Sequence, residues 1–148
     1  MGGEIKIRFW KWECNMIKRI SHIGLGVNEI GEARDFFERV LGLSASEREN
    51  FGELLFSFVQ MEGTDIELLQ STTPDGQIAK FINKRGQGIH HIAFEVDDIR
   101  SELERLKKNG VKLINEKPYV NAHQEWVAFL HPKSTFGVLV ELIQARDE

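Results

Sequence analysis

The 148-residue chain has a single cysteine and no long hydrophobic run. Cys14 alone cannot form an internal disulfide, and its isolation fits a reducing compartment. No apolar stretch approaches the roughly 18 residues that span a bilayer. The N-terminus lacks the apolar segment of a signal peptide, and Lys6 stands where a myristoylation motif requires serine or threonine. We therefore expect a soluble, cytoplasmic protein without a membrane partner.

Positive charge is also scarce. The 19 lysine and arginine residues are outnumbered by 23 aspartate and glutamate residues, which gives a formal net charge of −4. Because no cluster of basic residues marks a phosphate-binding surface, the composition argues against a nucleic-acid partner. Apolar residues make up 41% of the chain. A chain of this length buries about two thirds of its unfolded surface, so we expect one domain with its own core.

An internal repeat is the main organising feature of the sequence. Residues 22–30 match residues 91–99, with histidine, isoleucine, valine and isoleucine recurring in step. Residues 66–70 match residues 140–144 in the same way. The offset between the copies is 69 residues at the first match and 74 at the second, so one five-residue insertion accounts for the difference. The pattern indicates a duplication.

Each copy carries the elements of a βαβββ module. An alternating strand is followed by an amphipathic helix and then by further strands. In the first copy the predicted apolar face of the helix consists of Ile30, Ala33, Phe36, Phe37, Val40 and Leu41. The later strands are predicted to start at Leu43 and Val111 and to cover 54–60, 64–69, 125–130 and 137–144. A short linking helix is predicted over 77–84, between the copies.

The two copies place one histidine and one glutamate each at matched positions, namely His22 with Glu67 and His91 with Glu141. A carboxylate in an apolar strand is costly to bury unless a cation or hydrogen-bond donors compensate it. If the copies pair with pseudo-twofold symmetry, the four side chains can converge on one point. Two imidazoles and two carboxylates form a mixed nitrogen and oxygen set that suits zinc, nickel, cobalt or manganese.

The remaining features near these residues have less specific interpretations. Gly24 and Gly26 share a strand face with His22 and leave it unusually bare. His90 is expected to point to the face opposite to that of His91 and to be structural or supporting. His123 lies in a predicted loop and His131 in a proline-lysine turn, so both are expected at the surface.

This pattern resembles the vicinal-oxygen-chelate superfamily, which includes glyoxalase I, extradiol dioxygenases, antibiotic-resistance proteins and methylmalonyl-CoA epimerases. Five stretches are similar to the epimerase family in particular: 66–69, 77–82, 84–99, 129–134 and 137–142. The resemblance covers about residues 17 to 145. It implies an α+β fold in which modules 17–70 and 88–145 form an open, cup-shaped mixed β-sheet with helices outside. Residues 16–148 then form a single domain, and residues 1–15 are an N-terminal extension.

The resemblance also implies a function. It predicts a metal-dependent epimerase that interconverts the two epimers of methylmalonyl-CoA through a metal-stabilised enolate, with an acyl-CoA substrate and a homodimeric assembly. The implied ligands of the divalent metal are His22, Glu67, His91 and Glu141. A glyoxalase I-like lactoylglutathione lyase and a non-catalytic small-molecule-binding protein on the same scaffold are the alternatives.

Inverting a stereocentre requires two acid/base groups on opposite faces of the substrate. Glu141 is predicted to be one of them. In the epimerase family the second is a carboxylate on the strand after the first helix, where this chain has Leu55. Glu53, two residues earlier on the same predicted face, is therefore the candidate, and Glu47 and Glu49 are the alternatives.

A second departure from the family is Gln124, which stands where the family usually has glycine. Either departure is compatible with another base, another acyl group or a different reaction.

Overall fold

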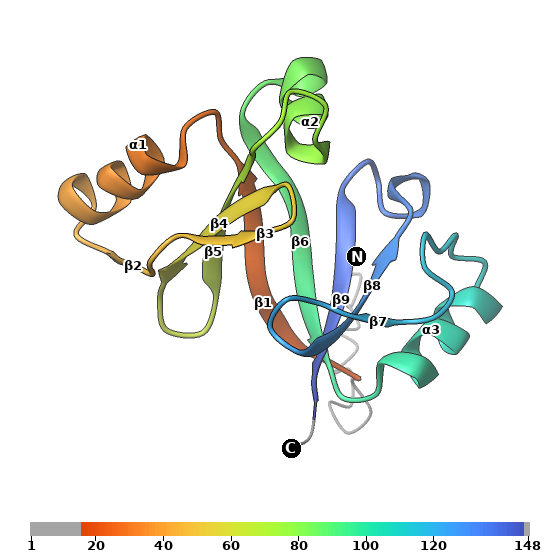
Figure 1. The fold of residues 1–148 in the computed structure, drawn as a ribbon. Helices are drawn as coiled ribbons and strands as arrows, with labels where there is room; N and C mark the ends of the chain where they lie inside the picture. Colours follow the sequence, from red (N-terminus) through yellow and green to blue (C-terminus); the bar gives the residue numbers. More distant parts are fainter. Residues whose placement is uncertain (1–15, 147–148) are drawn as a thin grey trace, which may run out of the picture.

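The computed structural model describes residues 16–146, which form one curved sheet flanked by helices (Figure 1). The order of the strands is β2-β4-β5-β1-β6-β9-β8-β7, and β3 pairs with β4. The strands are β1 Ile17–Gly26, β2 Ser44–Ala45, β3 Glu49–Phe51, β4 Leu54–Gln60, β5 Asp65–Ser71, β6 Gly88–Val96, β7 Tyr119–Val120, β8 Glu125–Leu130 and β9 Leu139–Ala145. The α-helices are α1 Ile30–Asp35, α2 Gln77–Arg85 and α3 Ile99–Lys108. None of these helices is long and apolar enough to cross a membrane.

The sheet has the symmetry of a duplication. β1 and β6, the first strands of the two modules, lie antiparallel at its centre, and Ile23 pairs with its equivalent Ile92. β1 then pairs in parallel with β5, and β6 pairs in parallel with β9 (Figure 1). A pseudo-twofold axis therefore passes between Ile23 and Ile92. The predicted fold class, an α+β protein with an open mixed sheet, is confirmed. The predicted extension, residues 1–15, lies outside the described residues.

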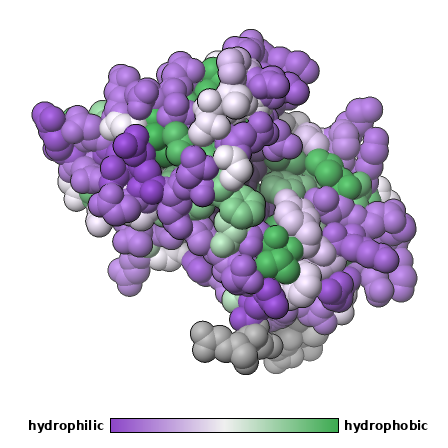
Figure 2. All heavy atoms as spheres, in the orientation of Figure 1, coloured by the Kyte–Doolittle hydropathy of each residue, from purple (hydrophilic) through white to green (hydrophobic). Residues whose placement is uncertain are grey.

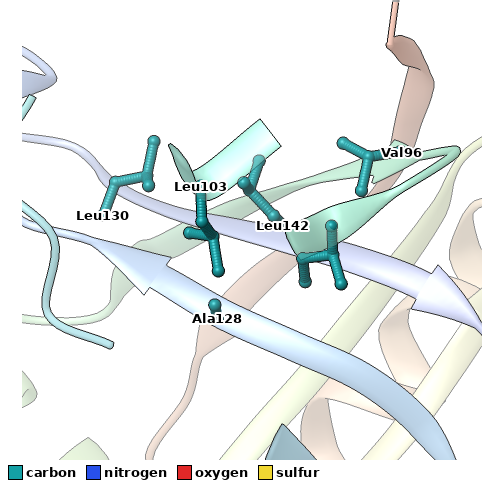
Figure 3. Packing of buried hydrophobic residues seen from close by; sticks show 6 residues of the cluster. Val96, Leu103, Ala128, Leu130 and Leu142 are labelled. Carbon is teal, nitrogen blue, oxygen red and sulfur yellow. The ribbon is translucent and has the colours of Figure 1, made fainter. Parts of the chain in front are cut away.

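Each module covers the outer face of its half of the sheet with its own helix. Ile30 of α1 packs with Val27, Val59 and Leu68 in one buried cluster. Leu103 of α3 packs in a second cluster against four residues of the strands (Figure 3). These residues are Val96, Ala128, Leu130 and Leu142. Because successive side chains of a strand point to opposite faces, the residues next to these core residues face the other side of the sheet.

A glutamine at the equivalent position anchors the first helix of each module. Gln70 Oε1 accepts a hydrogen bond from the Ile30 backbone N–H at 2.8 Å, and Gln144 Oε1 accepts one from the Ile99 backbone N–H at 2.8 Å. Backbone N–H groups in the first turn of a helix have no partner within the helix. The last strand of each module therefore positions the start of its helix in an equivalent way.

Two predicted elements differ from the structure. The predicted first helix is α-helical only to Asp35 and continues as a π-helical turn over Phe36–Val40. The wider turn changes the spacing of the side chains, so Phe36, Val40 and Leu41 are exposed rather than buried. In the second module no strand begins at Val111 among the described residues, and Leu113 forms only a single bridge to Leu130.

Candidate metal centre

The four predicted ligands meet on the concave face of the sheet. His22 Nε2 lies 3.1 Å from His91 Nε2 and 3.5 Å from Glu67 Oε2. Glu141 Oε2 lies 3.3 Å from His22 Nε2 and 3.1 Å from His91 Nε2. Both imidazoles and Glu141 are buried, and the side chain of Glu67 is 16% exposed. The structure thus brings all four side chains to one point.

Strand register explains this convergence. Two rows of residues run across the middle of the sheet, Glu67–Gly24–His91 and His22–Ala93–Glu141. Each row holds one histidine and one glutamate from different modules, separated by a small residue. The pseudo-twofold axis relates one row to the other. The convergence of the four predicted ligands is therefore a product of the symmetry and not of any local motif.

The bare strand face predicted at Gly24 makes room for a ligand. A Cβ atom on Gly24 would lie 2.3 Å from Cε1 and 2.4 Å from Nδ1 of His91. Such distances are impossible between non-bonded atoms, so any side chain at this position would displace the imidazole. Gly26 has a looser environment, because the nearest atom to its added Cβ would be Phe81 Cδ1 of α2 at 3.3 Å.

The two carboxylates differ in their electrostatics. Burial tends to raise the pKa of Glu141, but hydrogen bonds from His22 and His91, together with their charges, outweigh burial and hold the pKa at about 2. At Glu67 burial prevails over the charges of the same two histidines, and the pKa is raised. Burial lowers the pKa of His22, but the hydrogen bond with Glu141 and the two carboxylate charges produce a net raised pKa. Glu141 is thus held ionised, whereas burial makes Glu67 harder to ionise than a free carboxyl group.

The donor set fits a divalent cation. Ligand atoms of His22, Glu67 and His91 all lie within 4.8 Å of one another and could hold a metal ion, and Glu141 Oε2 adjoins both imidazoles. Among the described residues that line the surrounding cavity, Arg19 is the single lysine or arginine, and it pairs with Glu95. Buried carboxylates need compensating positive charge, and beyond the two imidazoles the described lining offers no unpaired lysine or arginine to supply it.

A cavity of about 790 Å³ opens above the four ligands. This volume is in the range of sites that bind small molecules and cofactors. Its lining comes from both ends of the sheet, since β3 and β4 of the first module and β7 and β8 of the second contribute side chains. On the side of the molecule displayed in Figure 2, apolar side chains gather toward the middle and hydrophilic side chains dominate the margins. The sheet therefore curves around a pocket whose floor carries the ligands.

Glu53 and Glu49 line this cavity, whereas Glu47 is not among its lining residues. Glu53 lies in the turn between β3 and β4 and is exposed, and its Oε2 accepts a hydrogen bond from Thr73 Oγ1 at 3.4 Å. The expectation that Glu53 and Leu55 share a face is wrong, because Leu55 packs in the cluster under α1 on the outer face. Glu53 belongs to a turn, where the alternation of a strand does not apply.

The expected orientation of His90 is also wrong. His90 lines the same cavity as His91, and the two Nδ1 atoms are 3.0 Å apart. Its ring meets the ring of Phe81 edge to face, with centroids 5.1 Å apart. Burial and the charge of His91 lower the pKa of His90 to about 4. His90 therefore contacts a ligand directly as a neutral side chain.

His123 is exposed, as the sequence predicted, but sequence reasoning missed that it also lines the cavity. Its side chain is 36% exposed and lines the cavity, with Nε2 3.3 Å from Glu49 Oε2. Its ring also contacts the rings of Phe56 and Phe58, with centroids 5.4 and 5.5 Å apart. His123 thus joins the second module to the first across the pocket. No pattern in the sequence signals a contact between a loop and a distant strand.

The unusual Gln124 follows His123 in the same loop. Its φ is +62°, in the left-handed region that favours glycine. A glycine at this position would adopt the conformation without strain, which gives a physical reason for the residue expected there. His131, the other histidine expected at the surface, begins the 3₁₀-helix Pro132–Ser134 and accepts a hydrogen bond from the Lys133 backbone N–H at 3.1 Å through Nδ1.

Known proteins resemble this chain along most of its length. Residues 21–129 match the Glyoxalase/Bleomycin resistance protein/Dioxygenase superfamily. The chain belongs to this superfamily. The matched residues include the predicted ligands His22, Glu67 and His91 and exclude Glu141.

Individual relatives match this chain along most of its length. An uncharacterized protein of Bacillus subtilis is 37% identical over 89% of this chain and 96% of its own length. The human mitochondrial methylmalonyl-CoA epimerase is 38% identical over 86% of this chain and 74% of its own length. A Streptomyces coelicolor methylmalonyl-CoA epimerase variant in complex with 2-nitronate-propionyl-CoA has a TM-score of 0.81 and 26% identity, covering 87% of this chain and 95% of that one.

Proposed function

We propose that this chain interconverts the two epimers of methylmalonyl-CoA with one divalent cation held by its four ligands. The observation that carries the proposal is the convergence of His22, Glu67, His91 and Glu141 on the floor of a cavity. The human relative is an epimerase of this substrate and matches along most of the chain, which supports an epimerase enzyme. The cation can be cobalt, zinc, nickel or manganese, since all accept imidazole and carboxylate ligands.

The reaction removes and returns the proton next to the thioester carbonyl. When bound, the cation would supply electrostatic stabilisation of the negative charge that develops on the thioester oxygen. Glu141 is one acid/base group: its low pKa keeps it ionised, and its Oε2 sits beside both imidazoles. From there it can accept the α-proton on one face of the substrate.

A second acid/base group must act from the opposite face. Glu53, the sequence-based candidate, and Glu49 both lie on the wall formed by β3 and β4. On β4, the ring of Phe58 contacts His22. Glu49 pairs with Phe56, the next cavity-facing residue of β4. Glu53 adjoins Leu54, which lies one cavity-facing residue farther from Phe58. His123 also holds Glu49 toward the cavity. This placement favours Glu49 and makes Glu53 the competing candidate.

The substrate class follows from the same cavity. A related epimerase of known structure binds 2-nitronate-propionyl-CoA, and about 790 Å³ accommodates the acyl group with part of its thioester arm. Arg19 is already paired with Glu95. The acyl end is therefore recognised mainly by the ligand set and by the rings of Phe56, Phe58 and Phe129 that line the pocket.

Solvent exchange tests the proposal directly. Metal-free protein, reloaded with each divalent ion in turn, is incubated with methylmalonyl-CoA in deuterated water. We expect deuterium at the α-carbon together with racemisation, and loss of both in Glu141→Ala. Exchange at the parental rate in that variant would remove Glu141 from the mechanism.

The same preparation separates the alternative functions. Turnover of the methylglyoxal–glutathione adduct without exchange of methylmalonyl-CoA would identify a lactoylglutathione lyase. If the protein binds either compound but turns over neither, it is a binding protein. Matched variants Glu49→Gln and Glu53→Gln assign the second acid/base: we expect the greater loss in Glu49→Gln, and the reverse order would assign the role to Glu53.

We also propose a homodimer in the cytoplasm. Several large apolar side chains stand exposed, among them Phe136 at 100% and Val40 at 67%, and apolar surface of this kind favours association. Sedimentation velocity measures the assembly, and a monomer at micromolar concentration would contradict the proposal.

A further inference from the structure

Each ligand histidine is preceded in the sequence by a polar residue that touches it. Ser21 Oγ lies 3.2 Å from Nδ1 of His22, and His90 Nδ1 lies 3.0 Å from Nδ1 of His91. Ser21 and His90 both line the same cavity as the ligands. In a regular strand, consecutive side chains point to opposite faces and could not meet in this way.

A β-bulge in the first module explains the contact of Ser21. The pairing of β1 with β6 moves from Ile20↔Phe94 to His22↔Ala93. Two steps along β1 thus correspond to one step along β6, and Ser21 is the extra residue. A bulge bends the strand and redirects a side chain, so Ser21 can reach the imidazole that follows it.

A second bulge does the same in the other module. The pairing moves from Gly24↔His91 to Leu25↔Ile89, so His90 is the extra residue, now on β6. The pseudo-twofold axis that relates the ligands therefore also relates the two bulges. The irregularity recurs immediately before the histidine in both copies, although the side chain that it redirects differs.

We infer that Ser21 and His90 are positioning residues that hold the two imidazoles with Nε2 toward the cation. The inference rests on the metal site of the proposed function. His22 and His91 direct their Nε2 atoms toward each other and toward Glu141 Oε2. An imidazole that binds metal through Nε2 carries its proton on Nδ1 and needs an acceptor there.

The two partners satisfy that need. Ser21 Oγ accepts from His22 Nδ1–H, and His90 Nδ1 accepts from His91 Nδ1–H. His90 then carries its own proton on Nε2, and the edge of the Phe81 ring fixes its orientation. Because a partner on Nδ1 sets both the tautomer and the ring angle, its loss weakens metal binding even though no ligand is removed.

Zinc titration of the metal-free, full-length protein by calorimetry tests the inference. We expect His90→Leu, which keeps an apolar contact with Phe81 but removes the acceptor, to weaken zinc binding about 10- to 100-fold. His90→Asn, whose amide oxygen can take the place of Nδ1, should retain most of the affinity. Zinc binding by His90→Leu at the parental affinity would overturn the inference.

The first module has its own matched set. Ser21→Ala should weaken zinc binding, and Ser21→Thr, which keeps the hydroxyl, should restore it. The control is Ser44→Ala. Ser44 is an exposed residue of β2, so this variant should bind zinc as the parent does. Equal affinities for Ser21→Ala and Ser44→Ala would remove Ser21 from the proposed role.

Nitrogen-15 NMR of the zinc-loaded parent tests the geometry without any variant. We expect His22 and His91 with the proton on Nδ1 and His90 with the proton on Nε2. Zinc on Nδ1 of either ligand, or a Nδ1 proton on His90, would overturn the inference. If zinc binds as expected but methylmalonyl-CoA is not exchanged, the proposed reaction fails while the positioning role stands; a parent that binds no divalent ion would overturn both.

Discussion

The two modules supply the same pair of predicted ligands, one histidine and one glutamate, in different surroundings. In the first module Glu67 is 16% exposed and its pKa is raised, because burial outweighs its attraction to the histidines. In the second module Glu141 is 8% exposed, and the two imidazoles hold its pKa at about 2. Duplication thus produced a symmetric frame, while the contacts inside that frame became unequal.

This inequality indicates a division of labour. Glu141 adjoins both imidazoles within 3.3 Å, whereas Glu67 lies 3.5 Å from His22. Carboxylates whose environments separate their pKa values are a recurrent feature of acid/base sites. The proposal that Glu141 is both a ligand and an acid/base group, with Glu67 a ligand alone, therefore predicts that the two carboxylates are not interchangeable.

The largest expected effect concerns catalysis. Glu141→Gln removes an acid/base group, so the rate of α-proton exchange should fall by about 10²- to 10⁴-fold. Glu67→Gln keeps an oxygen donor for the cation and should cause a much smaller fall. Exchange is measured by mass spectrometry at saturating metal. Similar losses in the two variants would contradict a division of labour.

The second prediction concerns the stability of the metal-free protein. A carboxyl group with a lowered pKa stabilises the fold above its unfolded pKa, and this contribution is lost as the pH falls through the folded value. Glu141→Gln should therefore cost about 1.5 to 3 kcal/mol at pH 7, and the cost should shrink as the pH falls from about 4.5 toward 2.

Glu67→Gln is the matched variant for that measurement. A raised pKa means that the ionised side chain destabilises the fold at neutral pH, so this substitution should leave the free energy of unfolding unchanged or increase it. Urea denaturation at pH 7 and pH 3 gives both values. Equal destabilisation of the two variants at pH 7 would show that Glu141 and Glu67 contribute equally to the free energy of unfolding.

The third prediction concerns Gly24, the small residue of the Glu67–Gly24–His91 row. Gly24→Ala places a methyl group 2.3 Å from Cε1 of His91, which should cost about 1 to 3 kcal/mol of stability through overpacking and weaken zinc binding. Gly26→Ala, on the same face with a nearest contact of 3.3 Å, is the control. Zinc affinity unchanged in Gly24→Ala would mean that His91 can move without cost.

The smallest effect concerns the equivalent hairpin turns. Gly52, between β3 and β4, and Gln124, before β8, both have a φ of +62°. Gln124→Gly should raise the free energy of unfolding by about 0.5 to 1 kcal/mol, because relief of left-handed strain exceeds the added chain entropy. Gly52→Ala should lower it by about 1 kcal/mol. Thermal unfolding of both variants checks the pair.

Much of the fold followed from periodicity. The predicted strands 54–60 and 125–130 coincide with β4 and β8, and the linking helix 77–84 corresponds to α2 Gln77–Arg85. Alternation and helical spacing are local properties, so they can be read along the chain. The π-helical turn after Asp35 escaped this reasoning because its apolar residues keep an α-helical spacing in the sequence but not in space.

The candidate site was predictable only where it is repeated. Matched positions in two copies predicted the four side chains that converge in the structure, whereas no repeat marks Glu49, His123 or the contact between them. The orientation of His90 was mispredicted because a bulge cancels the alternation on which the expectation depended. The role of Glu53 stays a prediction that the exchange experiment decides.

By itself, the sequence determined the duplication, most of the strands and the identity of the residues able to bind a cation, because each depends on spacing along one chain. Tertiary structure alone decided that His91 lies over Gly24, that Ser21 and His90 turn toward the ligands, and that Glu141 and Glu67 have opposite pKa shifts. Those properties depend on register between strands and on burial, and both arise only when the two modules pack against each other.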